Sequence, residues 1–511
     1  MPYWTSFPLS RLTSSYISLK SKGLAEHFHF TCTSLEKGAH YHQLHIPFER
    51  LYARKHRLSR LQSASSSQIP LFTNRQLVAL ILPIVVERML DVSIGFADTL
   101  MISSVGEAAV SSVSLVDSVN YLFLFLFSAL AAGGAVVVAQ YIGQRNARLA
   151  GDAAKQLIYS TTMVALLFTA TFLIFNRTIL TLLFGELEKE VLDQAQTYFA
   201  LTALSFPFLG LFNSGAALFR ATGNSRISMR VALVMTITNI TGNALLIFGF
   251  DMGVLGAGIA SLVSRIVAAS MMLALLLLKN DRIQIDHLLR IRMEWPMVRR
   301  ILRIGIPNGI ESGIFHVGKI IVLSLTASFG TVAIAANAIA NSVASMSNIP
   351  GAAVGIASIT VVGQCMGAGD HEQASYYAKK LMKIAYLTMA LVATTLFFSV
   401  EPMVGLFNLS AASTTLATEI LKIMCFTSAL LWPVSFALPQ VLRASGDVKF
   451  TMTVSIASMW IFRVGFSHVL GSYLGLGLHG IWFAMYIDWI CRSTCFVTRF
   501  LKGTWKTKKV I

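Results

Sequence analysis

The stretch that decides the fold runs from Leu82 to Gln144, beginning LPIVVERMLDVSIGFADTLM and ending AQYIGQ, and the chain contains it twice. At an offset of 224 residues, without a gap, the copies share a proline, a glutamate, two glycines and a glutamine: Pro83 and Pro307, Glu87 and Glu311, Gly106 and Gly330, Gly143 and Gly367, and Gln140 and Gln364. Duplication of a long apolar segment is typical of membrane transporters built from two repeats. Positions at which the copies differ should then locate the chemistry.

Composition places the chain in a membrane. Of its 511 residues, 55% are hydrophobic and 13% are charged, and the mean hydropathy is +0.66. Soluble proteins carry about 25% charged residues, and several apolar runs here are long enough to cross a hydrocarbon core about 30 Å thick. The sequence lacks the short alternating segments of a β-barrel. We therefore predict an all-α, polytopic membrane protein in contact with the lipid bilayer.

The formal net charge of +17 comes from basic residues in short connections and at the chain ends. This placement favours a role in membrane orientation over binding to nucleic acid. The five cysteines show no metal-ligand spacing. Cys491 and Cys495 lie one helical turn apart in an apolar run, which favours inert packing.

Residues 1–70 differ from the rest of the chain. They are rich in serine, histidine and basic residues, and they lack an apolar run of signal-sequence length. Three interpretations stay open: a disordered cytoplasmic extension, a transit-like peptide, or translation from upstream of the native start. The histidines are scattered, which favours solvated side chains over a metal site: His27, His29, His40, His42, His45 and His56.

From Arg75 onward the apolar runs predict twelve helices. The first six are expected at about 76–102, 108–142, 152–176, 190–220, 227–249 and 254–279. The second six are expected at about 304–328, 332–366, 375–400, 414–443, 449–471 and 476–500. The helices define an N-lobe (71–279), a cytoplasmic linker (280–303), a C-lobe (304–500) and a basic cytoplasmic tail (501–511). Two of them exceed the thickness of a bilayer, so bends are expected at Gly133, Gly134 and Pro350.

The basic residues also predict the orientation. They gather in the linker, in the tail and after the second, fourth, eighth and tenth helices, as at Arg145, Arg220 and Arg443. The connections after the first, fifth, seventh, ninth and eleventh helices carry almost none. The positive-inside rule then places both termini in the cytoplasm, in a multi-pass protein of the plasma (inner) membrane.

The first predicted helix carries three acidic residues, Glu87, Asp91 and Asp98. Spacings of four, seven and eleven residues put them on one helical face. A carboxylate inside a membrane is costly without a partner, water or a function. We therefore interpret Asp91 as a cavity carboxylate. Glu87, which both copies keep four residues after a proline, either has a shared structural role near the proline bend or faces the cavity, and the cavity interpretation is favoured. Asp117, on the second helix, faces either the same cavity or an outer vestibule.

The second copy changes this acidic face. Glu311 is retained, but Phe315 and Val322 stand at the positions of Asp91 and Asp98, and Lys319 replaces Gly95 beside His316. This asymmetry predicts that the N-lobe holds the driving cation. Glu311 either faces the cavity like Glu87, is neutralised by Lys319, or contacts substrate directly.

Two further features are interpreted as structural. Arg463 and Asp488 lie on adjacent predicted helices, and opposite charges inside a membrane favour an ion pair. Arg220 and Arg443 each precede a small-residue turn, RATGNS and RASGDVK, which is typical of a capped junction at the membrane surface.

Together these segments resemble the multidrug and toxic compound extrusion (MATE) family. The resemblance covers about residues 72–500 and rests on the twofold pattern, P-x-x-x-E in both halves, FADTLM, GGAVVVAQYIGQ with its counterpart VGIASITVVGQCMG, the two arginine turns, and NITGNALLIFG. It implies two pseudo-symmetric six-helix lobes around a central cleft. It also implies alternating access and export of organic, often cationic, compounds against entering Na⁺ or H⁺.

The resemblance implies a cation site as well. It points to Asp98 in FADTLM, completed by Asn239 and Asn243 on the fifth helix and Ser261 on the sixth. One carboxylate with amide and hydroxyl oxygens suits Na⁺, the only metal ion that we expect there. Asn243 stands where one branch of the family commonly has a second aspartate, so proton coupling through Asp98 alone stays open. The two asparagines could equally be hydrogen-bond contacts between helices.

We therefore expect a Na⁺- or H⁺-coupled antiporter of small molecules, acting as a monomer without a cofactor. Aromatic and methionine side chains could line a polyspecific cleft, although packing is favoured for each one: Phe123, Phe125, Phe127, Met346 and Met366. Enzymatic chemistry is not expected, because no phosphate loop, zinc signature or nucleophile motif is present. The alternatives are a flippase of lipid-linked or polysaccharide precursors, which would favour a basic cleft, and a receptor without transport.

Overall fold

The computed structural model describes residues 70–278, 282–285, 288, 290–407 and 410–511. Leu71–Ile511 form one structural unit, which is the part described below. The interpretations of the N-terminal extension, including its six histidines, lie outside the described residues.

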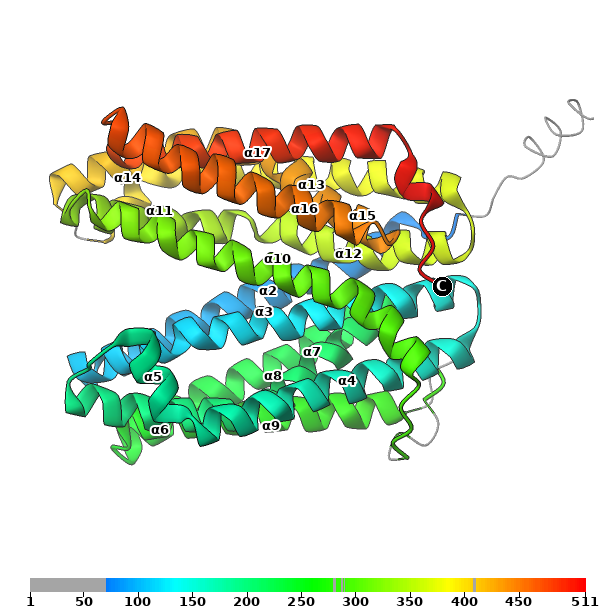
Figure 1. Cartoon of the computed structure of the whole chain (residues 1–511), viewed down its shortest axis with the longest axis horizontal. Coiled ribbons are helices and arrows are strands. Elements are labelled where there is room, and N and C mark those ends of the chain that lie inside the picture. The colour runs from blue at the N-terminus through cyan, green and yellow to red at the C-terminus, as the bar shows by residue number, and fades with distance from the viewer. Residues whose placement is uncertain (1–69, 279–281, 286–287, 289, 408–409) are drawn as a thin grey trace, which may run out of the picture. The chain divides into compact units, whose positions relative to one another are not determined.

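The first half of this unit is helical throughout (Figure 1). It contains α2 (Asn74–Ser103), α3 (Glu107–Gly143), α4 (Ala147–Ile174), the short α5 (Asn176–Phe184), α6 (Lys189–Leu204), α7 (Phe206–Ala221), α8 (Ser225–Asn243), η1 (Ala244–Gly249) and α9 (Gly253–Leu277). The helix α6 meets α7 at an angle of 43°, so the two form one broken span.

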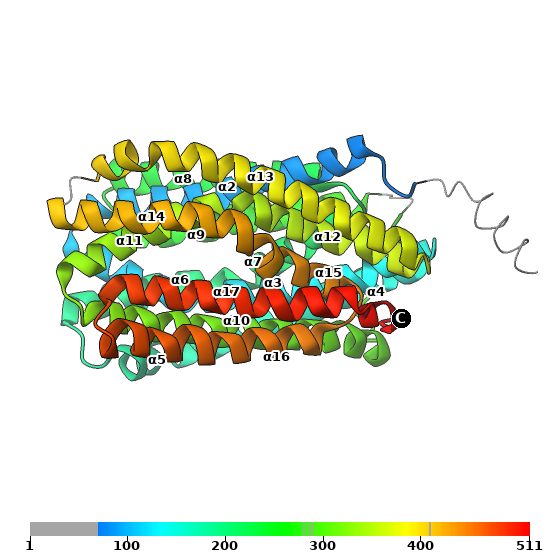
Figure 2. The same cartoon turned by 90° about the horizontal axis from the view of Figure 1, so that it is seen from above.

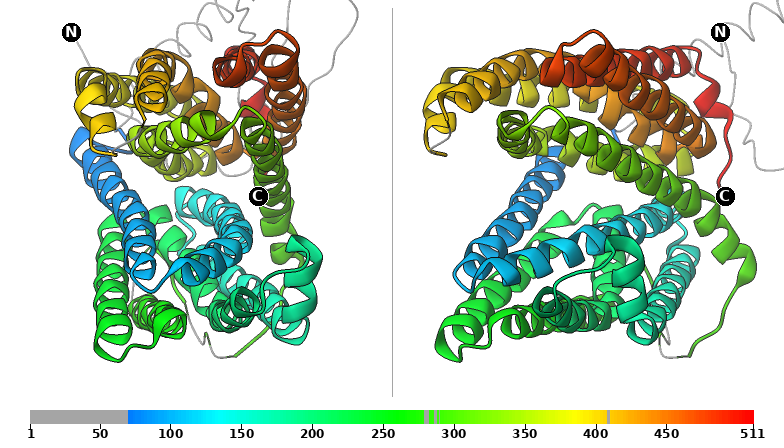
Figure 3. Two further views of the ribbon diagram at one scale, coloured as in Figure 1. Left: turned by 90° about the vertical axis from the view of Figure 1, so that its left-hand side faces the viewer. Right: turned by 60° about the vertical axis from the view of Figure 1, so that its left-hand side comes forward.

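The second half repeats the order. It contains α10 (Trp295–Ala327), α11 (Thr331–Ser347), α12 (Ile349–Gly367), α13 (His371–Gly405), α14 (Ala411–Trp432), η2 (Pro433–Ala437), α15 (Leu438–Ala444), α16 (Val448–Ser458), η3 (Met459–Gly465), η4 (His468–Tyr473), α17 (Gly477–Leu501) and the 3-10 turn η5 (Thr504–Thr507). Each half gathers into its own bundle, as Figures 1 and 3 show, and Figure 2 views the second half from above, over the first.

The twelve predicted helices are all present, with ends mostly within a few residues of those expected. Among the described residues, nine helical stretches are long and apolar enough to span a membrane, and the bent α6–α7 pair makes a tenth. The remaining two spans of the twelve are α2 and α17, which carry the intramembrane carboxylates Asp98 and Asp488. The helix α10 begins at Trp295, inside the segment predicted as a linker.

One of the expected bends occurs and the other does not. The eighth span breaks at Asn348, directly before Ile349 and Pro350, because proline cannot continue the hydrogen-bond ladder. The helix α3 instead runs unbroken for 37 residues. Its two interior glycines permit close packing: a Cβ on Gly133 would lie 2.7 Å from the Gly305 nitrogen of α10.

Local sequence explains how the first spans begin. Thr73 and Gln76 form a capping box at the start of α2, with the Thr73 amide donating to the Gln76 side chain at 2.8 Å. The turns before α3 and α11 contain Gly106 and Gly330, whose φ angles are 137° and 90°. A side chain rarely adopts such angles, which explains why both copies of the repeat keep glycine there.

The two lobes meet along α3, α10, α12 and the first half of α2. Hydrophobic side chains of α2, including Leu80 and Ile84, pack into a core with Val361 of α12. At the end that carries Arg145, Arg220 and Arg443, here called the basic end, the lobes touch backbone to backbone. A Cβ on Gly143 would lie 2.0 Å from the Gln364 carbonyl oxygen, and one on Gly367 would lie 1.9 Å from the Gln140 carbonyl oxygen.

Candidate functional site

Glu87 of α2 is buried and paired with a buried arginine. Arg220, at the end of α7, donates to its carboxylate at 2.5 Å, and Ser228 of α8 donates to the second oxygen at 2.8 Å. Only 3% of Glu87 is exposed. Because both oxygens are engaged, this carboxylate neutralises the arginine and ties α2 to α7 and α8.

The C-lobe repeats the pair. Arg443 donates to both Glu311 oxygens at 2.6 Å, and the Arg492 guanidinium lies 3.8 Å from the same carboxylate. Glu311 is buried as well. The interpretation of Glu87 and Glu311 as cavity carboxylates is therefore wrong, because each is enclosed against its duplicated arginine. Lys319 does not neutralise Glu311, since the two arginines do so.

The four residues that the family resemblance implied as a cation site come together in the N-lobe. The Asn243 amide donates to the Asp98 carboxylate at 2.5 Å, and the Asn239 amide donates to the Ser261 hydroxyl at 3.3 Å. Both asparagines and Ser261 are buried, while Asp98 is half-buried. Four side chains from α2, α8 and α9 thus surround one region.

The amide oxygens of this group have no hydrogen-bond donor. Among the residues that the structure describes, Asn239 Oδ1 and Asn243 Oδ1 are both buried without a partner. An unmet acceptor inside a protein is costly, so such oxygens favour a cation or water between them. The helix changes from α8 to the π-helical η1 directly after Asn243. Such π-helical turns often mark functional sites.

A second polar group lies beside the first. Asp117 of α3 is half-buried and accepts from Asn120 at 3.2 Å and from the Tyr198 hydroxyl at 3.4 Å. Arg265 of α9 interacts electrostatically with both Asp117 and Asp98, and it donates to Ser205 at 2.5 Å. The sequence analysis missed Arg265, although an arginine inside the apolar run of α9 was a visible signal.

Asp91 has a different environment from Glu87 and Asp98, with which it shares a helical face. It is exposed, and Arg88 donates to it at 3.1 Å across one helical turn. The cavity position of Asp91 stays a prediction, while Glu87 points into the protein. One helical face therefore holds a buried structural carboxylate, an exposed carboxylate and a half-buried candidate ligand.

The predicted ion pair between Arg463 and Asp488 is not formed. Both residues are buried, but Arg463 donates to the Met485 sulfur at 3.0 Å, and Asp488 accepts from the Ser458 hydroxyl. Arg463 is influenced by Asp488 only at longer range. On α10, the His316 ring packs on Phe125 of α3 at 4.2 Å between ring centroids, and Lys319 is exposed.

The apolar candidates for a cleft divide between core and surface. Phe123 and Phe127 are buried in the N-lobe, where Phe123 stacks with Phe206 at 5.4 Å. Met366 is buried and Met346 is exposed. For the two phenylalanines, the packing interpretation is confirmed.

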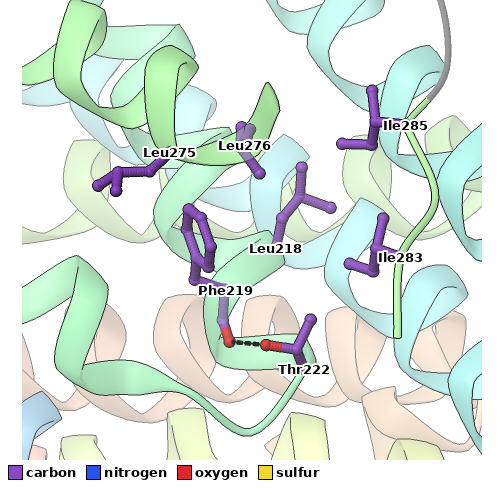
Figure 4. Close-up of a pocket in the computed structure, with 7 residues that line it drawn as sticks. All are labelled: Leu218, Phe219, Thr222, Leu275, Leu276, Ile283 and Ile285. Carbon is purple, nitrogen blue, oxygen red and sulfur yellow. Dashed lines mark hydrogen bonds between the residues drawn. The ribbon is translucent and has the colours of Figure 1, made fainter. Parts of the chain in front are cut away.

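A small apolar pocket lies at the basic end of the N-lobe (Figure 4). It is enclosed by α7, the end of α9 and the linker, and is lined by Leu218, Phe219, Thr222, Leu275, Leu276, Ile283 and Ile285. Thr222 turns its hydroxyl to the Phe219 carbonyl at 2.7 Å. With no charged lining and no acidic residue of the candidate site, this pocket is a packing feature of the linker.

These features define the class of the protein. Two repeated six-helix lobes, buried ionisable residues inside the spans, and a polar group between α2, α8 and α9 are the features of a multi-pass membrane transporter.

Comparison with known proteins identifies the family. The MatE family model matches residues 83–245 and 307–469, one match in each lobe, and the chain belongs to the MATE family of efflux transporters. It is 27% identical to the probable multidrug resistance protein NorM of Thermotoga maritima, over 86% of this chain and 94% of that protein. It is 23% identical to the multidrug export protein MepA of Staphylococcus saprophyticus, over 82% and 92% of the two chains.

The fold agrees with solved structures. One is described as the outward-facing conformation of a multidrug resistance MATE family transporter of the MOP superfamily. The TM-score is 0.79 at 20% identity, over 85% of this chain and 96% of that chain. The predicted twelve-helix, two-lobe fold is thereby confirmed.

Proposed function

We propose that this transporter exports amphipathic organic compounds by alternating access, driven by Na⁺ that enters through the Asp98 group. The observation that carries the proposal is the pair of buried, donor-free amide oxygens, Asn239 Oδ1 and Asn243 Oδ1, next to a carboxylate. The names of its relatives, a multidrug resistance protein and a multidrug export protein, support drug-like substrates.

The ligand chemistry favours Na⁺ over H⁺. Proton coupling needs only a carboxylate, whereas this group adds two amide oxygens and the Ser261 hydroxyl. Hard cations bind such oxygen atoms. Asp98 is the one charged member of the group, and the adjacent Asp117 and Arg265 have opposite charges, so the site suits a single monovalent cation.

The lysine and arginine pattern supports an orientation. With the basic end in the cytoplasm, both termini are cytoplasmic, in the plasma membrane of the cell. The lobes touch at that end, through Gly143 and Gly367, and this contact supports our proposal of an outward-open state. Asp91 and Lys319, both exposed within their spans, would then face water between the lobes, because lipid would not tolerate them.

Coupling follows if ion and substrate prefer different states. Na⁺ binding from outside would neutralise Asp98 and release substrate from the outward-open form. The ion-loaded transporter would then close on its outer side and open to the cytoplasm. No covalent step is required.

The test is dye export from everted vesicles under separate Na⁺ and pH gradients. We expect a Na⁺ gradient to drive the export of rhodamine 6G, and Asp98→Asn to abolish the gradient dependence. Asn239→Leu and Asn243→Leu should each raise the Na⁺ concentration for half-maximal transport about tenfold or more, since each removes one oxygen ligand. Transport driven by a pH gradient alone would show that the coupling ion is H⁺ and not Na⁺. Intact coupling in Asp98→Asn would show that Asp98 does not bind the coupling ion.

A matched control is Asn224→Leu. Asn224 is an exposed asparagine before the start of α8, outside the Asp98 group, so this change should leave the Na⁺ dependence unaltered.

A further inference from the structure

The duplication relates the candidate cation site to a set of positions in the C-lobe. At the offset of 224 residues, the counterparts of five N-lobe positions have changed from acidic, small or polar residues to basic or apolar ones: Asp91 to Phe315, Gly95 to Lys319, Asp98 to Val322, Asn239 to Arg463, and Ser261 to Met485. The family match covers both halves with the same offset through residue 245. The same place in the fold therefore holds oxygen ligands in one lobe and cations in the other.

Side-chain contacts support this correspondence. In the N-lobe, Asn239 of α8 contacts Ser261 of α9 at 3.3 Å. In the C-lobe, Arg463 of η3 contacts Met485 of α17 at 3.0 Å. Arg463 therefore takes the position that Asn239 has in the N-lobe. Its partner there, the Met485 sulfur, is only a weak acceptor and carries no charge.

Two guanidinium groups lie near one aromatic ring, and a lysine follows it one helical turn along the same helix. Phe315 lies on α10, with the Arg463 guanidinium 5.6 Å and the Arg492 guanidinium 5.7 Å from its ring centroid. Lys319 is one helical turn further along α10 and interacts electrostatically with Arg463. Arg492 also lies 4.7 Å from the ring centroid of Phe436. We call Phe315, Lys319, Phe436, Arg463 and Arg492 the C-lobe basic site.

The charges of this site are only partly balanced by the carboxylates of the described residues. Glu311 accepts from Arg443 and lies 3.8 Å from Arg492, and Asp488 accepts from Ser458 through one oxygen. In the described part of the chain, neither Lys319 nor Arg463 has a carboxylate within ion-pair distance. This region therefore contains two carboxylates and four basic side chains: Glu311 and Asp488, with Lys319, Arg443, Arg463 and Arg492.

Arg492 provides an independent sign of a missing partner. The residue is 3% exposed and donates through Nη2 to Ser455 at 2.7 Å, while its Nε and Nη1 atoms are buried without an acceptor among the described residues. Leaving guanidinium donors unpaired in a membrane protein is costly, and such residues mark sites of function. The acceptor that these donors lack is an anion or water.

The backbone around the site is irregular. Arg463 lies in the π-helical η3, and Phe436 lies in the π-helical η2. The N-lobe counterpart of η3 and η4 contains a single π-helical segment, η1. Because π-helical turns expose side chains at unusual angles and often mark functional sites, the second segment in the C-lobe fits a specialised binding surface.

We propose that the C-lobe basic site binds an oxyanion, a carboxylate or sulfonate, carried by an amphipathic aromatic substrate. The exposed ammonium of Lys319 meets the anionic group first. Arg463 and Arg492 supply long-range attraction behind Phe315, and the rings of Phe315 and Phe436 contact the aromatic part of the substrate. This inference rests on the proposed export function and names a substrate class for it: anionic or zwitterionic aromatic compounds.

The test is a comparison of two xanthene dyes of opposite charge. Full-length protein in phosphatidylcholine nanodiscs, without any ion gradient, is titrated with carboxyfluorescein and with rhodamine 6G by fluorescence anisotropy. Lys319→Gln should weaken carboxyfluorescein binding about tenfold and leave rhodamine 6G binding unchanged, and Lys319→Arg should restore it. Arg463→Gln should weaken carboxyfluorescein binding further, provided that size-exclusion chromatography shows folded protein.

Lys422→Gln is the matched control, because Lys422 is a half-exposed lysine paired with the exposed Glu401 at 2.7 Å, outside the C-lobe basic site. Unchanged carboxyfluorescein binding in Lys319→Gln, or equal loss of both dyes, would overturn the proposal. Addition of phosphatidylglycerol separates the two sources of oxyanion. If this lipid displaces carboxyfluorescein only when Lys319 is present, the site takes a lipid headgroup, and the organic-anion substrate is wrong.

The dye measurement is separate from the proposed ion coupling. Binding without a gradient does not depend on Na⁺-driven transport, so failure of the Asp98 experiment and failure of the carboxyfluorescein experiment remain distinguishable.

Discussion

The Gln140 side-chain amide, in the N-lobe helix α3, donates a 2.9 Å hydrogen bond to the backbone carbonyl of Ala444 in the C-lobe. Its repeat counterpart returns the contact: Gln364 of α12 donates to the Ala221 carbonyl at 2.7 Å. All four residues are buried. Each lobe therefore uses its duplicated glutamine to satisfy the helix end of the other lobe, and the pair holds the basic end shut.

Removing both glutamines should loosen this closure. In Gln140→Leu with Gln364→Leu, two buried carbonyls lose their donors, at a cost of about 1 kcal/mol each to the closed state. The ratio of closed to open basic ends should fall about tenfold or more. Electron-spin distances between labels at Arg148→Cys and His371→Cys, both exposed at this end, should show a longer component.

The control for this experiment is Gln156→Leu. Gln156 is a buried glutamine that donates to the Arg292 carbonyl near the linker, so it crosses no lobe boundary. An unchanged distance distribution in the double glutamine variant would show that the two hydrogen bonds do not hold the end closed.

Adding a methyl group at the same contact should have a stronger effect. Gly143→Ala would place a Cβ 2.0 Å from the Gln364 carbonyl oxygen, closer than any real contact, so the lobes must separate there. We expect the same spin labels to report an open basic end and dye export to decrease. Gly405→Ala is the control, because a Cβ at that helix end meets nothing within 4 Å. Wild-type distances in Gly143→Ala would contradict a tight closure.

The repeat pattern predicted most of the fold because hydrophobic runs and glycine turns are local signals. The spans from α2 to α17 follow from the length of the apolar runs, and Gly106 and Gly330 follow from the turns that they permit. The site was harder to predict, because its contacts join residues far apart in the chain. Asp98 and Asn243 met as the family resemblance implied, but that resemblance, rather than spacing, had named them.

The errors at charged residues share one physical cause. Spacing along a helix shows which residues share a face, but it does not show what lies opposite that face. Glu87 was assigned to a cavity because its partner, Arg220, is far away in sequence. A usable signal existed, since the glutamate and the arginine were both duplicated. The ion pair between Arg463 and Asp488 was predicted only because their helices are adjacent. In the structure, each contacts a neutral side chain instead.

The buried pairs predict large losses of stability when one partner is removed. Arg220→Met leaves the Glu87 carboxylate buried without its cation, and we expect a loss of about 3–5 kcal/mol in the free energy of unfolding. Glu87→Gln with Arg220→Met should recover most of this loss, because no charge remains unpaired. Thermal unfolding in detergent measures both. Lys422→Gln breaks an exposed pair and should change the melting temperature little; an equally small change in Arg220→Met would mean that the buried pair does not hold the N-lobe together.

Restoring a second carboxylate beside Asp98 should make ion binding depend on pH. In Asn243→Asp, a carboxyl group would replace an amide that now lies 2.5 Å from Asp98. Two carboxyl groups at that distance cannot both be ionised without a cation between them, so they share a proton at low pH and bind Na⁺ more tightly at high pH. Na⁺ titrations of the purified protein at acidic and alkaline pH should therefore diverge in the variant and stay closer together in the wild type. The same titrations of Asn224→Asp, at an exposed position before α8, should match the wild type. A pH-independent Na⁺ affinity in Asn243→Asp would place the ion away from the Asn243 side chain and leave Asp98 without its partner in coupling.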